Sequence, residues 1–211
     1  MESIYGEYKD NLEKVKDYIL YKIEDYNKPY EKTDHKLYEH LSVRIKSEES
    51  MKEKCIRKNL PVTPHSALSE LTDSIGFRIV CSFVEDIYKN IELIKNFENC
   101  SVVKEKDYIK NAKPNGYRSY HLILAVQTPF EDVNHNVPGT YYVEIQLRTI
   151  AMDTWAALEH QLKYKRNIKN TKIIEYELKR VADELASCDL SMQTIRHLIN
   201  DEEEHNENTT S

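Results

Sequence analysis

The chain has 211 residues, of which 40% are hydrophobic and 31% charged, and its net charge at pH 7 is −6. This length suits one substantial core but leaves little room for two domains, and the composition is typical of a globular rather than a disordered protein. No apolar run approaches the roughly 20 residues of a membrane-spanning helix. The N-terminus lacks the basic and apolar segments of a secretory signal. We therefore expect a cytoplasmic protein with no membrane partner.

Cysteine and histidine spacing argues against two kinds of site. The four cysteines are scattered with no Cys-x-x-Cys pair, and the eight histidines form no His-Glu-x-x-His motif. A disulfide framework and a cysteine zinc site are therefore not expected.

Charge is segregated along the chain. The last eleven residues contain five acids and no lysine or arginine, so the rest of the chain carries a net charge of only −1. Residues 40–60 contain six bases and three acids, a local charge of +3. These patterns predict a polyanion site in this segment and a disordered acidic tail over residues 201–211.

The first half of the chain mixes helical and strand patterns. Apolar residues recur at steps of three and four over residues 4–23, which predicts a long amphipathic helix. Alternation predicts a strand at residues 41–45, and a helix follows at residues 48–59 with Ser47 as its N-cap. A short helix is expected over residues 66–72.

The second half is expected to hold four strands, at residues 75–83, 101–109, 118–127 and 140–148, and three helices, at residues 84–97, 150–165 and 172–200. The clearest turn is Lys113-Pro-Asn-Gly116. This order predicts an α+β fold with a mixed sheet of about five strands, helices on one side, and terminal helices free to pack on partners. We expect a single domain over residues 1–200.

Polar side chains alternate along the predicted strand at residues 140–149. Because successive side chains on a strand point to opposite faces, one face buries aliphatic residues and the other presents Glu144, Gln146 and Arg148 in a row. A carboxylate, an amide and a guanidinium in a row predict a site for a charged ligand. Glu144 is the best acid–base candidate, and the alternative is a structural glutamate paired with Arg148.

Four bases lie within fourteen residues on the predicted strand and helix around Ser47. Arg44 and Lys46 share a strand face, and Lys54 and Arg57 share a helix face. Together they would hold several phosphates, although a solvated basic face is an equally good interpretation.

An aspartate and an arginine flank the start of the strand at residues 75–83. Asp73 is a candidate magnesium ligand, because Mg²⁺ prefers one or two carboxylates together with phosphate oxygens. The alternative, favoured for this segment alone, is that Asp73 caps a turn and pairs with Arg78.

The third cluster follows the turn at Lys113. Tyr117, Ser119 and His121 are expected on one strand face. Tyr117 can stack on a base, while Lys113 and His121 can contact phosphates. Singly, a structural tyrosine or a core histidine would be the ordinary explanation; the combination favours a site.

Taken together, these clusters resemble the synthetase domain of RelA/SpoT-type alarmone synthetases, and most closely the small single-domain, RelQ-like kind. The stretches that carry the resemblance are HLSVRIKSEESMKEKCIRK, LTDSIGFRIVCSFVEDIY, DYIKNAKPNGYRSYH and VEIQLRTIAMDTWAALEH. They span about residues 38–164, which would be the catalytic core, with the terminal helices serving packing and oligomerisation.

The resemblance implies a nucleotidyltransferase-like fold and Mg²⁺-dependent transfer of pyrophosphate from ATP to the ribose 3′-hydroxyl of GTP, GDP or GMP, with AMP as co-product. It implies that Arg44 and Arg78 sandwich the adenine. Lys46, Lys54 and Arg57 would hold the ATP phosphates. Asp73 and Glu144 would bind the metal as the catalytic pair, and Glu144 would also take the 3′-hydroxyl proton.

For the acceptor nucleotide, the resemblance implies that Tyr117 stacks on guanine and that Gln146 lines the site. The acceptor phosphates would be held by Lys106, Lys113 and His121. Asp153 stands where relatives usually carry an asparagine near the guanine edge, so the acceptor preference is expected to depend on it.

The resemblance also implies partners and limits. No His-Asp dipeptide is present, and we expect synthesis without hydrolysis. RelQ-type members form homotetramers and respond to alarmone or single-stranded RNA. Two alternatives stay open: a related synthetase that pyrophosphorylates the tRNA 3′ end, and a non-catalytic nucleotide- or RNA-binding module.

Overall fold

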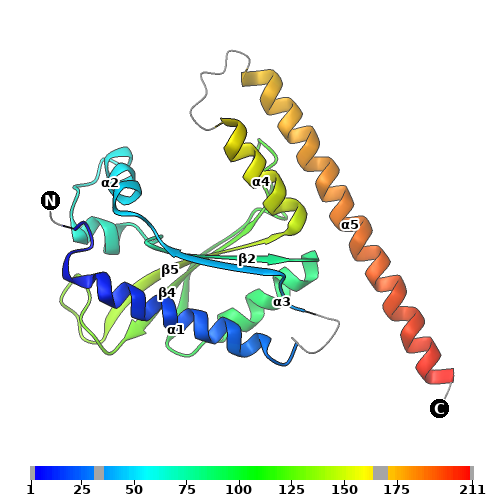
Figure 1. Ribbon diagram of the computed structural model, residues 1–211, viewed down its shortest axis with the longest axis horizontal. Coiled ribbons are helices and arrows are strands. Elements are labelled where there is room, and N and C mark those ends of the chain that lie inside the picture. Colours follow the sequence, from blue (N-terminus) through cyan, green and yellow to red (C-terminus); the bar gives the residue numbers. More distant parts are fainter. Residues whose placement is uncertain (1–2, 31–35, 164–170, 210–211) are drawn as a thin grey trace.

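The computed structural model describes residues 3–30, 36–163 and 171–209, and its centre is a single five-stranded sheet (Figure 1). The strand order is β1 (His40–Ile45), β2 (Ile75–Cys81), β5 (Gly139–Thr149), β4 (Tyr120–Thr128) and β3 (Cys100–Asp107). The β2–β5 pair is parallel and the other pairs are antiparallel, which confirms the predicted mixed sheet of five strands.

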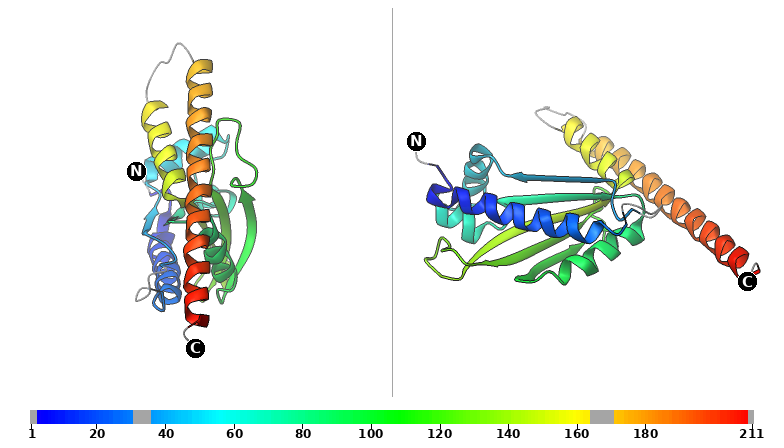
Figure 2. Two further views of the ribbon diagram at one scale, coloured as in Figure 1. Left: turned by 90° about the vertical axis from the view of Figure 1, so that its right-hand side faces the viewer. Right: turned by 60° about the horizontal axis from the view of Figure 1, so that its bottom comes forward.

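Helices α1 (Lys9–Asn27) and α3 (Val84–Lys95) cover one face of this sheet, with the short 3₁₀ helix η1 (Gly6–Tyr8) before α1 (Figures 1 and 2). Their apolar stripes are buried with the inward side chains of the strands, including Ile19 of α1 and Ile91 of α3. The expectation that both terminal helices are free to pack on partners is wrong for α1, because its apolar stripe completes the core of the chain itself.

Helix α2 (Glu48–Arg57) starts where its N-cap predicts. The hydroxyl oxygen of Ser47 accepts a hydrogen bond from the backbone N–H of Ser50 at 3.3 Å. The short helix expected next is a π-helical turn, η2 (Ser66–Glu70), which ends just before β2. Strand β2 and helix α3 lie within their predicted ranges.

Strand β4 starts later than predicted. The backbone N–H of Lys113 bonds to the carbonyl of Tyr117 at 3.1 Å, and Gly116 has a φ of +91°, so the chain is still turning at residue 117. Tyr117 and Ser119 therefore precede the strand instead of sharing a strand face with His121. Ser119 is fully buried, and its hydroxyl donates to the carbonyl of Leu147 at 3.1 Å.

Two C-terminal helices, α4 (Ile150–Lys163) and α5 (Thr171–Thr209), lie at the end of the sheet that is away from α2 (Figure 2). Trp155 joins them, since its indole N–H donates to the carbonyl of Leu178 at 2.8 Å. The predicted helix end at residue 200 is wrong, because α5 continues to Thr209. No glycine or proline occurs over residues 201–209, and glutamate favours helix, so nothing local ends α5.

Helix α5 is attached to the body by an apolar cluster, in which Leu178 and Ala182 pack with Trp155 of α4, and by several polar contacts. Thr149 donates to the carboxylate of Asp189 at 2.7 Å, and Arg196 pairs with Asp86 at 2.7 Å. Several apolar side chains of α5 are exposed: Ile173, Tyr176, Leu190, Met192, Ile195, Leu198 and Ile199. Among the described residues, no helix combines the length and apolarity needed to cross a membrane.

Candidate active site

The polar face of the sheet, opposite α1 and α3, carries a cleft of about 410 Å³. Its lining comes from β1, β2 and β5 and from the segments beside them: Ser42, Val43, Arg44, Lys46, Asp73, Gly76, Phe77, Arg78, Glu144 and Gln146. The register makes Gly76 the cross-strand neighbour of both Arg44 and Glu144. Six of the residues singled out from the sequence therefore face one cleft, although they come from three separate stretches of chain.

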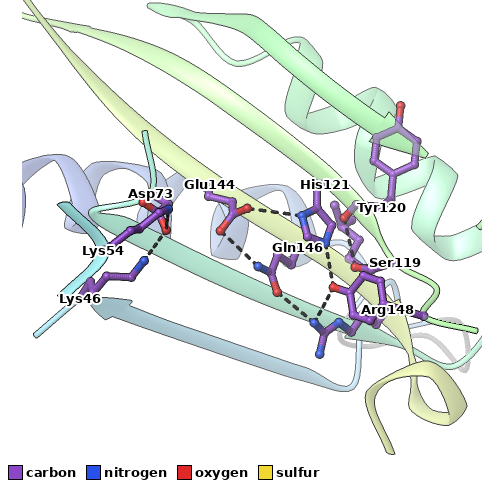
Figure 3. Close-up of polar contacts among 11 residues, drawn as sticks. Lys46, Lys54, Asp73, Ser119, Tyr120, His121, Glu144, Gln146 and Arg148 are labelled. Atoms are coloured by element: carbon purple, nitrogen blue, oxygen red, sulfur yellow. Dashed lines mark hydrogen bonds and ion pairs between the residues drawn. The ribbon is translucent and has the colours of Figure 1, made fainter. Parts of the chain in front are cut away.

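Asp73 is held by two lysines at one end of this cleft. The ammonium groups of Lys46 and Lys54 both contact Asp73 Oδ2, the latter at 2.5 Å (Figure 3). Burial acts to raise the pKa of Asp73, but the hydrogen bonds and charges of the two lysines outweigh it and hold the pKa below its ordinary value. The alternative in which Asp73 pairs with Arg78 is not observed, and the partners of Asp73 are Lys46 and Lys54.

The second oxygen of Asp73 bears on metal binding. Oδ1 is buried and has no hydrogen-bond partner among the described residues. An ionised carboxylate with one free oxygen suits a divalent cation that completes its shell with phosphate oxygens. In the described part of the chain, no group of three or more His, Cys, Asp or Glu side chains is arranged to hold a metal ion.

Glu144 is bound through both carboxylate oxygens. His121 Nδ1 lies 3.3 Å from Oε1, and Gln146 Nε2 donates to Oε2 at 3.1 Å (Figure 3). Burial and the charge of Asp73 raise the pKa of Glu144, yet His121 and Gln146 together hold it below its usual value. The carboxylate is therefore ionised at neutral pH, and its partners are not the predicted alternative, Arg148.

Arg148 makes contacts that the sequence pattern did not reveal. Its side chain is buried, and Nη2 donates to Tyr117 Oη at 2.8 Å and to Gln146 Oε1 at 3.1 Å. Its Nη1 donates to Asp153 at 3.0 Å, and the same carboxylate oxygen lies 3.5 Å from Arg78 Nη1. The alternating pattern placed Arg148 in the polar row beside Gln146 but could not identify Tyr117 and Asp153 as its partners, because these two come from other segments.

An aromatic group lies beside this network. Tyr117 Oη and His121 Nε2 are 2.8 Å apart, and the ammonium of Lys113 lies 4.5 Å from the centre of the Tyr117 ring. Tyr108, which the sequence analysis missed, presents its ring 4.6 Å from the same ammonium and 5.4 Å from the His121 ring. The only sequence signal for it was an aromatic residue two positions after Lys106, whose own ammonium is 5.7 Å from the Tyr108 ring.

The turn that carries Lys113 and Tyr117 packs on α5. A Cβ on Gly116 would come within 2.5 Å of the Ala182 Cβ, so the two backbones approach closely. Arg118 donates to the Ala182 carbonyl at 3.4 Å and pairs with Asp183 at 3.3 Å. Helix α5 therefore supports this turn.

The structure does not bring every predicted residue to the cleft. Arg57 is exposed on the last turn of α2, and neither it nor Lys106, Lys113 or Asp153 lines the cleft. Asp153 is nevertheless connected to the cleft through Arg78, and Lys113 through Tyr117 and His121. For Arg57 the structure adds no contact with the other predicted residues.

The fold and the cleft define an α+β domain with a cation-rich, dicarboxylate site. Comparison with known proteins specifies the family. The model of a region found in RelA/SpoT proteins matches residues 43–169. GTP pyrophosphokinase YwaC of Bacillus subtilis is 42% identical over 149 residues, covering 71% of this chain and 69% of YwaC. GTP pyrophosphokinase YjbM of the same organism is 34% identical over 177 residues, 84% of this chain and 77% of YjbM.

Solved structures agree with this match. The crystal structure of small alarmone synthetase 1 from Bacillus subtilis aligns with a TM-score of 0.74 at 32% identity, covering 92% of this chain and 94% of the other. That of small alarmone synthetase 2 from the same organism aligns with a TM-score of 0.73 at 38% identity, over 86% and 92%. The chain therefore belongs to the RelA/SpoT family.

Proposed function

We propose that this protein is a small alarmone synthetase of the GTP pyrophosphokinase type, which makes (p)ppGpp from ATP and GTP or GDP. The observation that carries the proposal is the single cleft in which Asp73 and Glu144 lie with Lys46 and with two arginines. Two similar structures support the proposal. Small alarmone synthetase 1 from Bacillus subtilis bound to its product pppGpp is 33% identical to this chain, and the same synthetase bound to AMPCPP is 31% identical.

On the donor side, Arg44 and Arg78 hold the adenine between their planar guanidinium groups. They stand on adjacent strands, where Arg44 pairs with Gly76 and Arg78 lies two residues further along β2. Lys46 and Lys54, which converge on Asp73, neutralise the phosphates. Arg57 contributes from the exposed side of α2.

Asp73 and Glu144 would hold Mg²⁺, which the free oxygen of Asp73 suits. When bound, the ion supplies neutralisation of the phosphate charge that develops in the transfer.

On the acceptor side, Tyr117 stacks on guanine and Gln146 lines the site. Lys106 and Lys113 hold the 5′ phosphates, whereas both ring nitrogens of His121 are engaged by Tyr117 and Glu144. Glu144 is ionised and half-buried in the cleft, and it accepts the proton of the ribose 3′-hydroxyl. The 3′ oxygen then bonds to the β-phosphorus of ATP, the bond from that phosphorus to the α-phosphate oxygen breaks, and AMP leaves. Positioning and charge neutralisation supply most of the rate enhancement in such a transfer.

Acceptor range, assembly and regulation form the finer part of the proposal. Asp153 takes part in guanine recognition and decides between GMP, GDP and GTP. The protein functions as one synthetase domain over residues 1–200, without hydrolase activity. It assembles as a homotetramer through the exposed apolar side chains of α5, and it responds to alarmone or single-stranded RNA.

Purified protein incubated with labelled ATP, Mg²⁺ and separately GMP, GDP, GTP or tRNA tests the proposal. Label on GDP or GTP is expected. Label on tRNA alone, or AMP release with no acceptor labelled, would contradict it, and degradation of added ppGpp would contradict the absence of hydrolysis.

A further inference from the structure

We propose that Arg148 is a positioning residue for Glu144: it directs two hydrogen-bond chains that end on the two oxygens of that carboxylate. One chain runs through Tyr117 and His121. The other runs through Gln146 (Figure 3). The kinetic consequence rests on the proposed function, whereas the hydrogen-bond pattern does not.

The direction of the first chain follows from donor and acceptor chemistry. A guanidinium can only donate, so the Tyr117 oxygen accepts from Arg148 Nη2 at 2.8 Å. The Tyr117 hydroxyl proton is then free to point at His121 Nε2, 2.8 Å away. With Nε2 accepting, the imidazole proton is on Nδ1 and faces Glu144 Oε1 at 3.3 Å. The chain thus selects the histidine tautomer that can donate to the carboxylate.

The second chain fixes the side-chain amide of Gln146. The other hydrogen of Arg148 Nη2 requires an acceptor, and Gln146 Oε1 supplies it at 3.1 Å. This orientation turns the amide nitrogen toward Glu144 Oε2 at 3.1 Å. The flipped amide would oppose donor to donor at Arg148 and oxygen to oxygen at Glu144. One guanidinium nitrogen therefore determines both contacts of the carboxylate.

Asp153 keeps Arg148 in place. Arg148 is only 6% exposed, and a buried guanidinium without a counter-charge is strongly unfavourable. Asp153 supplies that charge through its 3.0 Å bond to Nη1 and also lies 3.5 Å from Arg78, which lines the cleft. The same network therefore connects the adenine side of the cleft to the residues that hold Glu144.

If Arg148 acts by positioning Glu144, breaking a hydrogen-bond chain should lower kcat much more than it changes the KM for the acceptor. Tyr117→Phe keeps the ring for stacking but removes the hydroxyl that links Arg148 to His121. Residues that orient an active-site ligand from behind typically contribute about 10–100-fold to activity. We expect kcat to fall by about tenfold or more in Tyr117→Phe, with the KM for the acceptor changed less than about threefold. Tyr142→Phe, which removes a β5 hydroxyl outside both chains, is the matched control.

Arg148→Lys completes a double-mutant cycle. Lysine keeps the charge but cannot donate to Tyr117, Gln146 and Asp153 with one planar group. If Arg148 acts through Tyr117, the double variant loses less kcat than the product of the two single losses. Fully multiplicative losses would overturn the proposal, as would a Tyr117→Phe enzyme whose acceptor KM rises while kcat stays unchanged.

The histidine tautomer gives a readout that needs no activity and remains available if Arg148→Lys does not fold. In protein with ¹⁵N-labelled histidine at pH 8.5, the His121 ring is expected to carry its proton on Nδ1, and to lose that preference in Tyr117→Phe. A proton on Nε2 in the wild-type protein would overturn the proposal. Wild-type protein that has the Nδ1 tautomer but makes no alarmone would instead refute the proposed function and leave the hydrogen-bond chains standing.

Discussion

Gly76 on β2 lies directly opposite Glu144 on β5 in the parallel register, and a Cβ on Gly76 would meet nothing within 4 Å. The backbone of Gly76 therefore forms the floor of the cleft beside the Glu144 carboxylate. The space above it is open because glycine has no side chain. Substitution here would fill the cleft without disturbing the core behind the sheet.

We therefore predict that Gly76→Ala keeps the stability of the protein and that Gly76→Leu keeps the fold but blocks nucleotide binding. The KM for ATP should rise on the order of tenfold or more in Gly76→Leu, which corresponds to about 1.4 kcal/mol of lost binding. Thermal unfolding and ATP titration measure the two effects. A Gly76→Leu protein with normal ATP affinity would show that nucleotide does not occupy this floor.

Glu144→Gln should abolish product formation while largely sparing nucleotide binding. The amide keeps the size of the side chain but cannot accept a proton, and general-base catalysis contributes about 10²–10⁴-fold. Labelled-ATP assays and calorimetric titration of nucleotide separate the two quantities. Near-normal turnover would remove Glu144 as the base.

The lysine-bound carboxylate of Asp73 should make stability depend on pH in a defined direction. Its pKa is below the ordinary value of 3.8, so its ionised form stabilises the folded state. That contribution is fully present above the unfolded pKa and is lost as pH falls through the folded one. In metal-free protein, the advantage of wild type over Asp73→Asn in free energy of unfolding should stay constant above about pH 5 and shrink below about pH 4. An advantage that grows on acidification would contradict the ion-paired state.

Asp153→Asn should change acceptor preference. The carboxylate is shared by Arg148 and Arg78, and its removal takes a negative charge from beside an anionic substrate. We expect the ratio of kcat/KM for GTP to that for GMP to increase. Identical profiles across GMP, GDP and GTP for wild type and variant would exclude Asp153 from acceptor selection.

Gly116→Ala should weaken the acceptor turn because the added methyl would meet Ala182 of α5. Gly6→Ala is the matched control: Gly6 also has a positive φ, +53°, but its Cβ would be 3.5 Å from the nearest atom. The control should lose about 1 kcal/mol of stability, and Gly116→Ala about 1–3 kcal/mol more. Chemical denaturation measures both losses. Equal losses of unfolding free energy in the two variants would mean that α5 can shift at Ala182 to accommodate the added methyl group at little cost.

Much of the fold was predictable because it follows local rules. Period-two alternation identified β1 and β5, the Ser47 cap located the start of α2, and the turn at Gly116 separated β3 from β4. One error lies where a non-local contact decides: the N-terminal helix is in the core because the sheet needs a cover. The other error is local, since α5 continues past residue 200 because no residue there ends it.

The sequence by itself determined the residue types of the site, the faces of β1, β2 and β5 on which several of them lie, and the family that this combination resembles, since each depends on neighbours only a few positions apart. Only the tertiary structure decided which charges meet: Asp73 with Lys46 and Lys54, Glu144 with His121 and Gln146, and Arg148 with Tyr117 and Asp153. Those pairs depend on strand order and register across the sheet, which bring distant segments within hydrogen-bond distance and which no local pattern encodes.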